Sequence, residues 1–459
     1  MSQIITFSNK AVSNLTTPQL LKGGLYLTWA ASLLLLVTTI SGVQKQRHAI
    51  KTVGNDATPS IVTAQRLKDA LAGMDANAAN ELLVPPGQNQ EAAKGYRERY
   101  EAVAERLVTA AENISYGDKE RKAIETMQLG LGDYIAKIQQ ARDFHARGET
   151  NAMLFAYRAA GEIMDKTLLP ASDELDKINL QALEDTYAEQ KLAASKSLML
   201  IFVSGVALIN VLVGLQIFLS LRMRRTLNPG LLGATAIAII FLYYTGGALL
   251  SASQNLRVAK EDAFTSMHSL RQARAAAYIA NTTESRYLLD SAFSRNHEQA
   301  FIKNITQIAQ LPNGQTFESI AAAYSAQGKK VDGFKGYLAE ELNNVTFDGE
   351  QKAMVENLLT LGKYVAIDGQ IRQLERSGKH QEAIALCLGM KPGESNWAFD
   401  EFRNANQKAF DINQDAFDKA IKQGFQDVYG FEMITPVALS AIALLSLFGL
   451  LPRLKEYSA

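Results

Sequence analysis

The sequence has a single cysteine, Cys387, among its 459 residues. One thiol cannot form a disulfide within the chain, and a zinc or iron–sulfur site built from several thiolates is excluded. Histidine is also scarce, because only five are present and none has the spacing of a metal-binding motif. We therefore predict no bound metal and no cofactor.

Net charge is absent as well, since 47 Lys and Arg balance 47 Asp and Glu. Without a basic field, a nucleic-acid partner is not expected. The sequence also lacks a nucleophile elbow, a dinucleotide fingerprint and a phosphate-binding loop. We predict no catalytic residues and conclude that the chain is not an enzyme.

The sequence does have four uncharged apolar runs, each long enough to cross a bilayer. A hydrocarbon layer of roughly 30 Å requires about 20 helical residues. No small-residue cleavage site follows the first run, so we predict a retained span and not a signal peptide. The chain should be a multi-pass protein of a bacterial cytoplasmic (inner) membrane, surrounded by lipid. The predicted spans are residues 25–43, 197–221, 231–253 and 432–452.

The short segments between and beyond the spans are basic, which predicts that they are cytoplasmic. They are the N-terminal tail 1–24, the loop 222–230 and the C-terminal tail 453–459. Both termini are then cytoplasmic, and the long segments 44–196 and 254–431 are extracytoplasmic. None of the cytoplasmic parts is long enough for a catalytic domain. The basic residues expected at the cytoplasmic face are Arg222, Arg224, Arg225, Arg453 and Lys455.

The two halves of the chain look like copies of one unit. A shift of 206 residues places Asn55-Asp56-Ala57 on Glu261-Asp262-Ala263. Further along, a shift of 230 residues places 131–136 on 361–366. The growing shift predicts about 24 extra residues in the second copy, around 312–336.

Both long segments have the periodicity of packed helices and lack the alternation typical of strands. Helices should break at proline and glycine. We predict an all-α fold of four transmembrane helices with two tandem extracytoplasmic four-helix bundles, produced by internal duplication, whose outer helices are continuous with the spans. The expected breaks lie at 85–87, 117–118 and 148–149, and at 311–312, 349, 378 and 391–393.

Two groups of polar residues are candidates for binding a ligand or partner. Asp75, Asn77 and Asn80 lie near the membrane-distal end of the first outer helix. Such residues are also common at ordinary helix ends, and this alternative remains open. Arg142 and Arg372 occupy matched repeat positions and could each hold a carboxylate with two hydrogen bonds. Pairing on a bundle surface is the alternative for these arginines.

Short motifs at 74–80, 141–148, 156–171, 412–418 and 449–457 carry a family resemblance. Through them the chain resembles the actinobacterial-type four-span membrane proteins of an aspartate/glutamate-sensing system. In that system the membrane protein acts with a solute-binding lipoprotein and a soluble Ser/Thr kinase. The outer segments also resemble the four-helix-bundle sensor domains of chemotaxis receptors, although no HAMP helices or signalling coiled coil follow. The resemblance implies a periplasmic solute-binding protein and a cytosolic Ser/Thr kinase as partners.

Two classes of function remain open. The leading hypothesis is a non-enzymatic sensor that receives a small ligand (an amino acid) or a loaded solute-binding protein and signals to a cytoplasmic partner. One chain supplies two bundles, so an intramolecular pseudo-dimer or a homodimer would fit this hypothesis. The alternative is a structural or scaffolding subunit of a membrane or envelope assembly. A transporter is disfavoured because the spans hold no ionisable residue.

Overall fold

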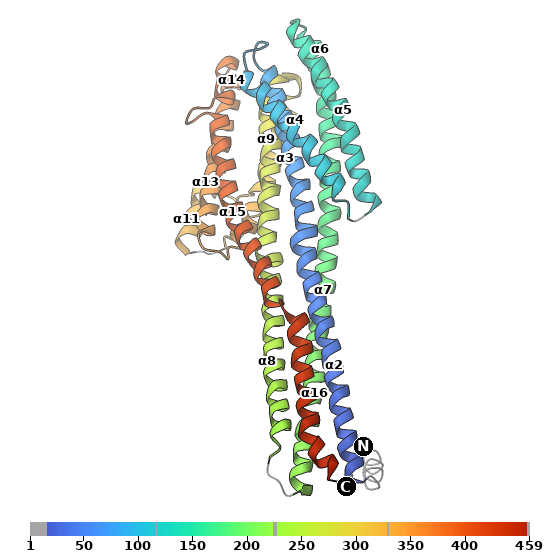
Figure 1. Cartoon of the computed structure of the whole chain (residues 1–459). Helices are drawn as coiled ribbons and strands as arrows, with labels where there is room; N and C mark the ends of the chain where they lie inside the picture. The colour runs from blue at the N-terminus through green and yellow to red at the C-terminus, as the bar shows by residue number, and fades with distance from the viewer. Residues whose placement is uncertain (1–15, 116, 224–226, 328–329, 457–459) are drawn as a thin grey trace, which may run out of the picture. The chain divides into compact units, whose positions relative to one another are not determined.

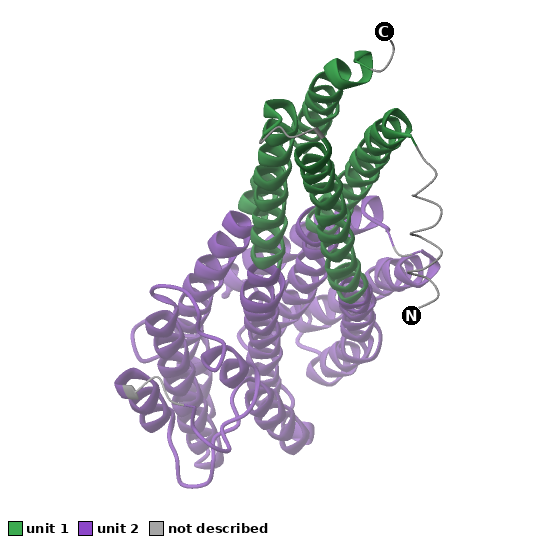
Figure 2. Ribbon diagram, turned by 90° about the horizontal axis from the view of Figure 1, so that it is seen from below, with its two compact units in different colours: residues 1–51, 186–256, 421–459 green, residues 52–185, 257–420 purple. Residues whose placement is uncertain are grey.

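The structure is a computed structural model, and it describes residues 16–115, 117–223, 227–327 and 330–456 (Figure 1). Across these ranges the regular elements are helices, with no strand and one isolated bridge between Gln310 and Lys335. The predicted all-α fold is confirmed. The chain divides into two compact units, which Figure 2 colours separately. The span unit comprises the described parts of 1–51, 186–256 and 421–459, and the bundle unit comprises 52–185 and 257–420.

Four helices of the described chain are long and apolar enough to cross a membrane. They run continuously past the predicted spans, so the chain is a multi-pass membrane protein. The membrane's identity and the sidedness of the termini stay predictions, and Arg224 and Arg225 lie outside the described residues. The four helices are α2 (Thr17–Lys51), α7 (Leu169–Met223), α8 (Pro229–Arg257) and α16 (Phe431–Lys455).

Within the span unit, α8 and α16 approach each other closely. The side-chain Nδ2 of Asn228 donates to the carbonyl oxygen of Gly449 at 2.7 Å. A Cβ atom on Gly230 would lie only 2.7 Å from the carbonyl oxygen of Leu445. Glycine therefore permits this contact, as small residues do between membrane helices generally.

Three helical runs continue without a break from the span unit into the bundle unit: 17–82, 150–222 and 229–289. Each of them contains a π-helical segment, and two of these segments, η1 (Thr52–Ala57) and η3 (Val258–Phe264), lie at positions that the shift of 206 residues relates. A π-helical turn holds an extra residue and is rare, so its presence at matched positions of the two copies supports a duplication.

The fourth junction differs from the continuous helix expected there. Helix α15 (Ser395–Asp427) ends before α16 begins, and Gly430 in the intervening turn has a φ of +79°. An L-residue in the left-handed region costs about 1–2 kcal/mol. Glycine therefore allows the chain to turn where the other three junctions stay helical.

Replacing Gly430 with alanine should lower the free energy of unfolding by about 1 kcal/mol, because alanine does not favour that backbone conformation. Gly247 in α8 is a matched control, since it is helical and a Cβ there meets no atom within 4 Å. Gly247→Ala should leave stability unchanged or raise it slightly. Thermal unfolding of the purified protein in detergent measures both. Equal melting temperatures for Gly430→Ala and its parent would contradict a left-handed backbone conformation at Gly430.

In the first copy of the bundle unit, the helices are interrupted at each expected break. This copy consists of four successive helical runs, the last of which leads into α7. They are α3 (Thr58–Leu82), α4 (Gln90–Glu112), α5 (Asp118–Ala146), and α6 (Thr150–Ile163) with the π-helical η2 (Met164–Leu168).

The second copy repeats this plan with an insertion. The extra residues form α11 (Phe317–Gln327) and α12 (Tyr337–Leu342), and the Gln310–Lys335 bridge joins the ends of this region. The remaining helices match those of the first copy. They are α9 (Thr265–Leu289), α10 (Ser294–Ile308) with the preceding 3₁₀ turn η4 (Ser291–Phe293), α13 (Glu350–Arg376), α14 (His380–Leu388) and α15.

Helices α3 and α9, which occupy equivalent places in the two copies, pack against each other in the core of the bundle unit (Figure 1). Both are rich in alanine and other small residues, which let their backbones come close. The Thr282 hydroxyl on α9 donates to the carbonyl oxygen of Ala72 on α3 at 3.2 Å. We call the contact of α3 and its neighbours with α9 and its neighbours the copy interface.

Candidate functional site

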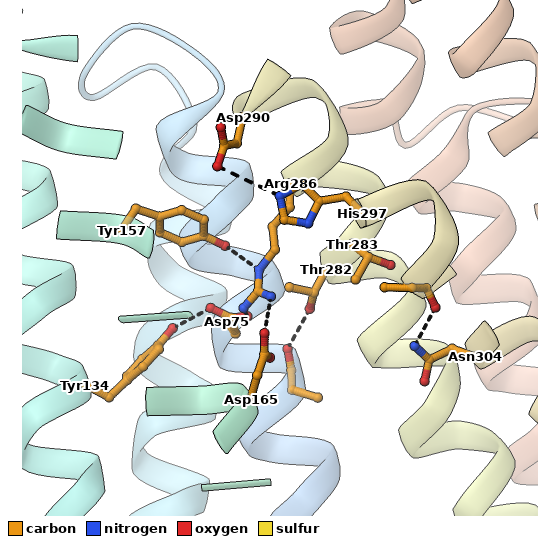
Figure 3. Close-up of polar contacts among 12 residues, drawn as sticks. Asp75, Tyr134, Tyr157, Asp165, Thr282, Thr283, Arg286, Asp290, His297 and Asn304 are labelled. Atoms are coloured by element: carbon orange, nitrogen blue, oxygen red, sulfur yellow. Dashed lines mark hydrogen bonds and ion pairs between the residues drawn. The ribbon is translucent and has the colours of Figure 1, made fainter. Parts of the chain in front are cut away.

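A buried arginine of the second copy reaches into the first copy at the copy interface (Figure 3). The guanidinium of Arg286 donates to Asp75 Oδ2 at 2.6 Å and to Asp165 Oδ2 at 2.7 Å. Its Nε donates to the Tyr157 hydroxyl at 3.2 Å, and Tyr134 donates to Asp75 Oδ1 at 2.9 Å. These five side chains form the Arg286 cluster. They join α9 to α3, α5, α6 and η2.

The centre of the Arg286 cluster is shielded from solvent, since Asp75 is 1% exposed and Arg286 is 6% exposed, whereas the side chain of Asp165 is about half exposed. Burial raises the pKa of Asp75 above its usual value, and the positive charge of Arg286 opposes that rise. Burial also raises the pKa values of Tyr134 and Tyr157 well above their usual range, with Asp75 adding to the effect. Both tyrosines are therefore neutral and act as hydrogen-bond partners. The cluster is a compensated buried charge network.

A second ion pair continues the network toward α10. Arg158 donates to both carboxylate oxygens of Asp290, at 2.7 and 2.6 Å, and its guanidinium lies 4.7 Å from the centre of the Phe293 ring. The His297 Nε2 atom lies 3.9 Å from Asp290 (Figure 3). Burial lowers the pKa of His297 to about 4, so this imidazole is neutral at neutral pH. Arg158 is thus the cation that compensates Asp290.

Charged contacts extend further along α9. Asp69 on α3 lies 3.6 Å from both Arg271 and Arg274. The Oδ2 atom of Asp176 is 3.1 Å from His268 Nε2, and it accepts a 2.8 Å hydrogen bond from Gln272. The copy interface is therefore specified by paired polar groups along much of α9, in addition to small-residue packing.

A polar pocket of about 310 Å³ also lies at the copy interface. We call it the copy pocket. It is formed by α3 and α4 of the first copy and by α9, the end of α14, Met390 and α15 of the second. Its amide side chains are Asn77, Asn80, Asn89, Asn281 and Asn396. Its charged side chains comprise three bases and three acids: Lys94, Arg99, Arg403, Glu91, Glu98 and Asp400.

Two guanidinium groups flank one tyrosine in the copy pocket. Arg99 donates to the Tyr278 hydroxyl and lies 4.8 Å from the centre of its ring. Arg403 lies 5.7 Å from the same ring and pairs with Asp400 at 2.7 Å. Asn281 is 4% exposed and neighbours the side chain of Tyr364. The pocket thus offers hydrogen-bond donors from both copies.

The structure separates the three predicted site residues of α3. Asp75 belongs to the Arg286 cluster, whereas Asn77 and Asn80 line the copy pocket. The Asn80 Oδ1 accepts a hydrogen bond of 2.5 Å from Ser285 of the second copy. None of the three terminates the helix, because α3 continues to Leu82. Their roles in ligand binding stay predictions.

The matched arginines both pair with carboxylates of this chain. Arg142 donates to Glu81, with an Nη2–Oε2 distance of 2.6 Å, and lies 4.2 Å from the centre of the Tyr96 ring. Arg372 is 5% exposed and donates to both oxygens of Asp368, at 2.8 and 2.7 Å. Neither arginine lines the copy pocket. A ligand carboxylate would have to displace an existing partner from either one.

Removing the side chain of Arg142 should lower the free energy of unfolding by about 1 kcal/mol, the value of a partly exposed ion pair with an aromatic contact. Arg147→Ala is a matched control, since the Arg147–Glu149 pair is about half exposed and should contribute little. Chemical denaturation of the purified chain measures both. A loss of several kcal/mol for Arg142→Ala would contradict a partly solvated pair.

Several residues of the site were not singled out from sequence. The Arg286 cluster depends on Arg286, Tyr157 and Asp165, and the copy pocket depends on Tyr278 and Arg403. Two signals were available: Tyr134 and its repeat equivalent Tyr364 belong to the matched motifs 131–136 and 361–366, and Tyr157 and Asp165 lie in the motif 156–171. Within the described ranges, no group of three His, Cys, Asp or Glu residues could hold a metal ion.

Comparison with known families bears on the first copy. Residues 49–188 match the family described as the actinobacterial sensor domain. This match supports a sensor protein of actinobacterial type. It spans α3 to α6 and the beginning of α7, the part of the chain that supplies Asp75, Asn77 and Asn80. No curated protein and no solved structure matches the chain.

Proposed function

We propose that this chain is a non-enzymatic membrane sensor and signal transducer. It receives a small ligand (an amino acid) or a loaded solute-binding protein on the bundle unit, and it signals to a cytoplasmic partner, for which a Ser/Thr kinase is the expected class. The observation that carries the proposal is the sensor-domain match at residues 49–188, which lies between two helices long enough to span a membrane.

Continuous helices provide a physical route for such a signal. The runs 17–82, 150–222 and 229–289 each join a span to the bundle unit without a break. A ligand that favours one of two helix arrangements shifts the population toward that arrangement, and packed helices move in discrete small steps. The paired charges of the copy interface are suited to define such discrete arrangements. A shift of one copy against the other would break several ion pairs at once, so intermediate positions are disfavoured.

The cytoplasmic output is tested in a bacterial strain from which the chain has been deleted. External amino acid is added to cells with and without a plasmid copy of the full chain, and Ser/Thr phosphorylation is measured by mass spectrometry. We expect amino-acid-dependent phosphorylation changes only when the chain is present. Identical phosphorylation in both strains, with and without amino acid, would remove the support for a transducer.

The receiving surface is tested by crosslinking. Phe155 on α6 and Leu129 on α5 are each 75% exposed, which makes them suitable positions for a photo-reactive side chain. The full chain in membranes is combined with purified solute-binding protein, with or without amino acid. Contact that increases with the amino acid supports reception of a loaded binding protein. If the crosslinking yield is the same with and without the amino acid, and phosphorylation is also unchanged, the scaffolding alternative is supported.

A further inference from the structure

The two copies contact each other in a pseudo-symmetric way, and this relation links the Arg286 cluster to the copy pocket. At the shift of 206 residues that relates α3 to α9, Asp75 corresponds to Asn281 and Arg286 corresponds to Asn80. In a two-fold interface, every contact between one pair of positions has a counterpart with the positions exchanged. The counterpart of the Asp75–Arg286 ion pair is therefore Asn281 with Asn80. Both of these asparagines line the copy pocket.

The surrounding residues follow the same relation. Tyr134, which donates to Asp75, corresponds at a shift of 230 residues to Tyr364, which lies near Asn281. Tyr157, which contacts Arg286, corresponds to the smaller Cys387. The long guanidinium side chain and one phenol of the first site are thus replaced by shorter groups in the second. In the second site Asn80 accepts a hydrogen bond from Ser285, and Cys387 contacts Ser285 and Glu284, so among these residues no ion pair forms between the two copies.

We propose that the copy pocket, which Asn80 and Asn281 line, binds a small zwitterion, a molecule with one carboxylate and one ammonium group. This proposal rests on the proposed sensor function and names its ligand class. The buried amides Asn80 and Asn281 carry no charge, and the rim has three bases and three acids. A ligand with a net charge would bury that charge without full compensation, which is costly.

The pocket has groups for both ends of a zwitterion. Arg99 and Arg403 flank Tyr278, and the Nε of Arg403 has no hydrogen-bond partner. Guanidinium groups are suited to hold a carboxylate. Glu91 and Glu98 line the same pocket and supply the negative charge that an ammonium group requires. The buried amide of Asn281 adds a donor to the pocket wall.

Size and position also fit a small ligand with a signalling role. The volume of about 310 Å³ is near the lower end of ligand pockets, which span roughly 300–1,000 Å³. Residues of both copies line the pocket, so a bound molecule contacts α3 and α4 as well as α9 and α15. Binding then favours the arrangement of the two copies in which all these contacts form.

Binding is tested on the full chain in detergent with Trp29→Phe, which leaves Trp397 as the only tryptophan. Trp397 is adjacent to Asn396, which lines the pocket. L-alanine and L-glutamine are the neutral zwitterions, and L-glutamate, L-lysine and glucose are the comparators. We expect saturable fluorescence changes and a higher melting temperature with at least one neutral zwitterion, and at least about tenfold weaker binding of every comparator. No saturation by either zwitterion up to about 10 mM, or a comparator that binds as tightly, overturns the proposal.

A double variant tests the site itself. Asn80→Arg with Asn281→Asp rebuilds the ion pair of the equivalent site and should fill the pocket. We expect binding to weaken by at least about tenfold while the melting temperature is retained. Asn151→Arg is the matched control, because Asn151 is an exposed asparagine of α6 and its replacement should leave binding unchanged. Unchanged affinity in a folded double variant overturns the proposal.

A rim variant covers the case in which the double variant does not fold. Arg403 is only partly buried, so Arg403→Gln is compatible with folding. It should weaken binding of the neutral zwitterion by at least about tenfold and leave the weaker binding of ethanolamine, which has no carboxylate, unchanged. Equal losses for both compounds, or no loss for the zwitterion, overturn the assignment of Arg403 to the carboxylate.

The two proposals fail in different ways. If no zwitterion binds but the phosphorylation response to external amino acid is normal, the proposed ligand site is overturned and the sensor function stands. Saturable, pocket-dependent binding without any phosphorylation response upholds the pocket and overturns the transducer.

Discussion

Replacing Arg286 with alanine should destabilise the bundle unit by about 3–5 kcal/mol, the cost of removing one partner from a buried ion pair. The variant leaves the carboxylate of Asp75, which is 1% exposed, without its cation. It also removes the hydrogen bonds to Asp165 and Tyr157. Because these contacts join the two copies, the loss should affect both of them.

Chemical denaturation and amide hydrogen exchange of the full chain in detergent measure this loss. Arg142→Ala is the control, since its ion pair is partly exposed and should cost about 1 kcal/mol. Combining Arg286→Met with Asp75→Asn should recover most of the stability, because no charge then remains buried without a partner. A loss below about 1 kcal/mol for Arg286→Ala would show that the cluster does not stabilise the copy interface.

Raising the pH from about 5 to about 9 should destabilise the bundle unit, with Glu284 as one cause. Burial raises the pKa of Glu284 to about 8, with the nearby Asp368 adding to the rise. Its Oε1 accepts hydrogen bonds from Ser395 at 2.6 Å and from Cys387 at 3.5 Å, and its Oε2 has no partner. This arrangement suits a neutral, protonated carboxyl group.

The sign of the pH effect follows from proton binding. The folded pKa of Glu284 is about 8 and its ordinary value is 4.5, so the folded chain binds more protons between these values. The stability from the neutral carboxyl is fully present below about 4.5 and is lost as the pH rises through about 8. Each pH unit in that window corresponds to about 1.4 kcal/mol for one fully titrating group.

Glu341 contributes in the same direction. Burial raises its pKa to about 8, and the nearby Glu350 adds to the rise. Asn413 Nδ2 donates to both carboxyl groups, at 3.2 and 2.8 Å. Glu284→Gln combined with Glu341→Gln should therefore flatten the dependence of melting temperature on pH between about 5 and about 9. Glu98→Gln, at an exposed position, is the control. If melting temperature depends on pH with the same slope in the double variant and the parent, the two buried carboxyl groups are not neutral as inferred.

The sequence by itself indicated four spans, many of the helix breaks and the duplication, but it missed the breaks after Leu289 and after Asp427. A span requires only a sufficient length without charge, and left-handed glycines such as Gly87, Gly148 and Gly378 mark turns between helices. Both are local properties, so the turns at 85–87, 117 and 148–149 could be predicted from neighbouring residues alone. The insertion could be located as well, because it shifts the register between two similar copies.

The tertiary structure alone decided which polar side chains meet. Asp75 and Arg286 are far apart in the sequence, and only the packing of α3 on α9 joins them. Helical periodicity shows which face a residue occupies but not which helix covers that face. For the same reason Asp75 and Asn77, two residues apart, belong to different sites, one a closed ion cluster and one an open pocket.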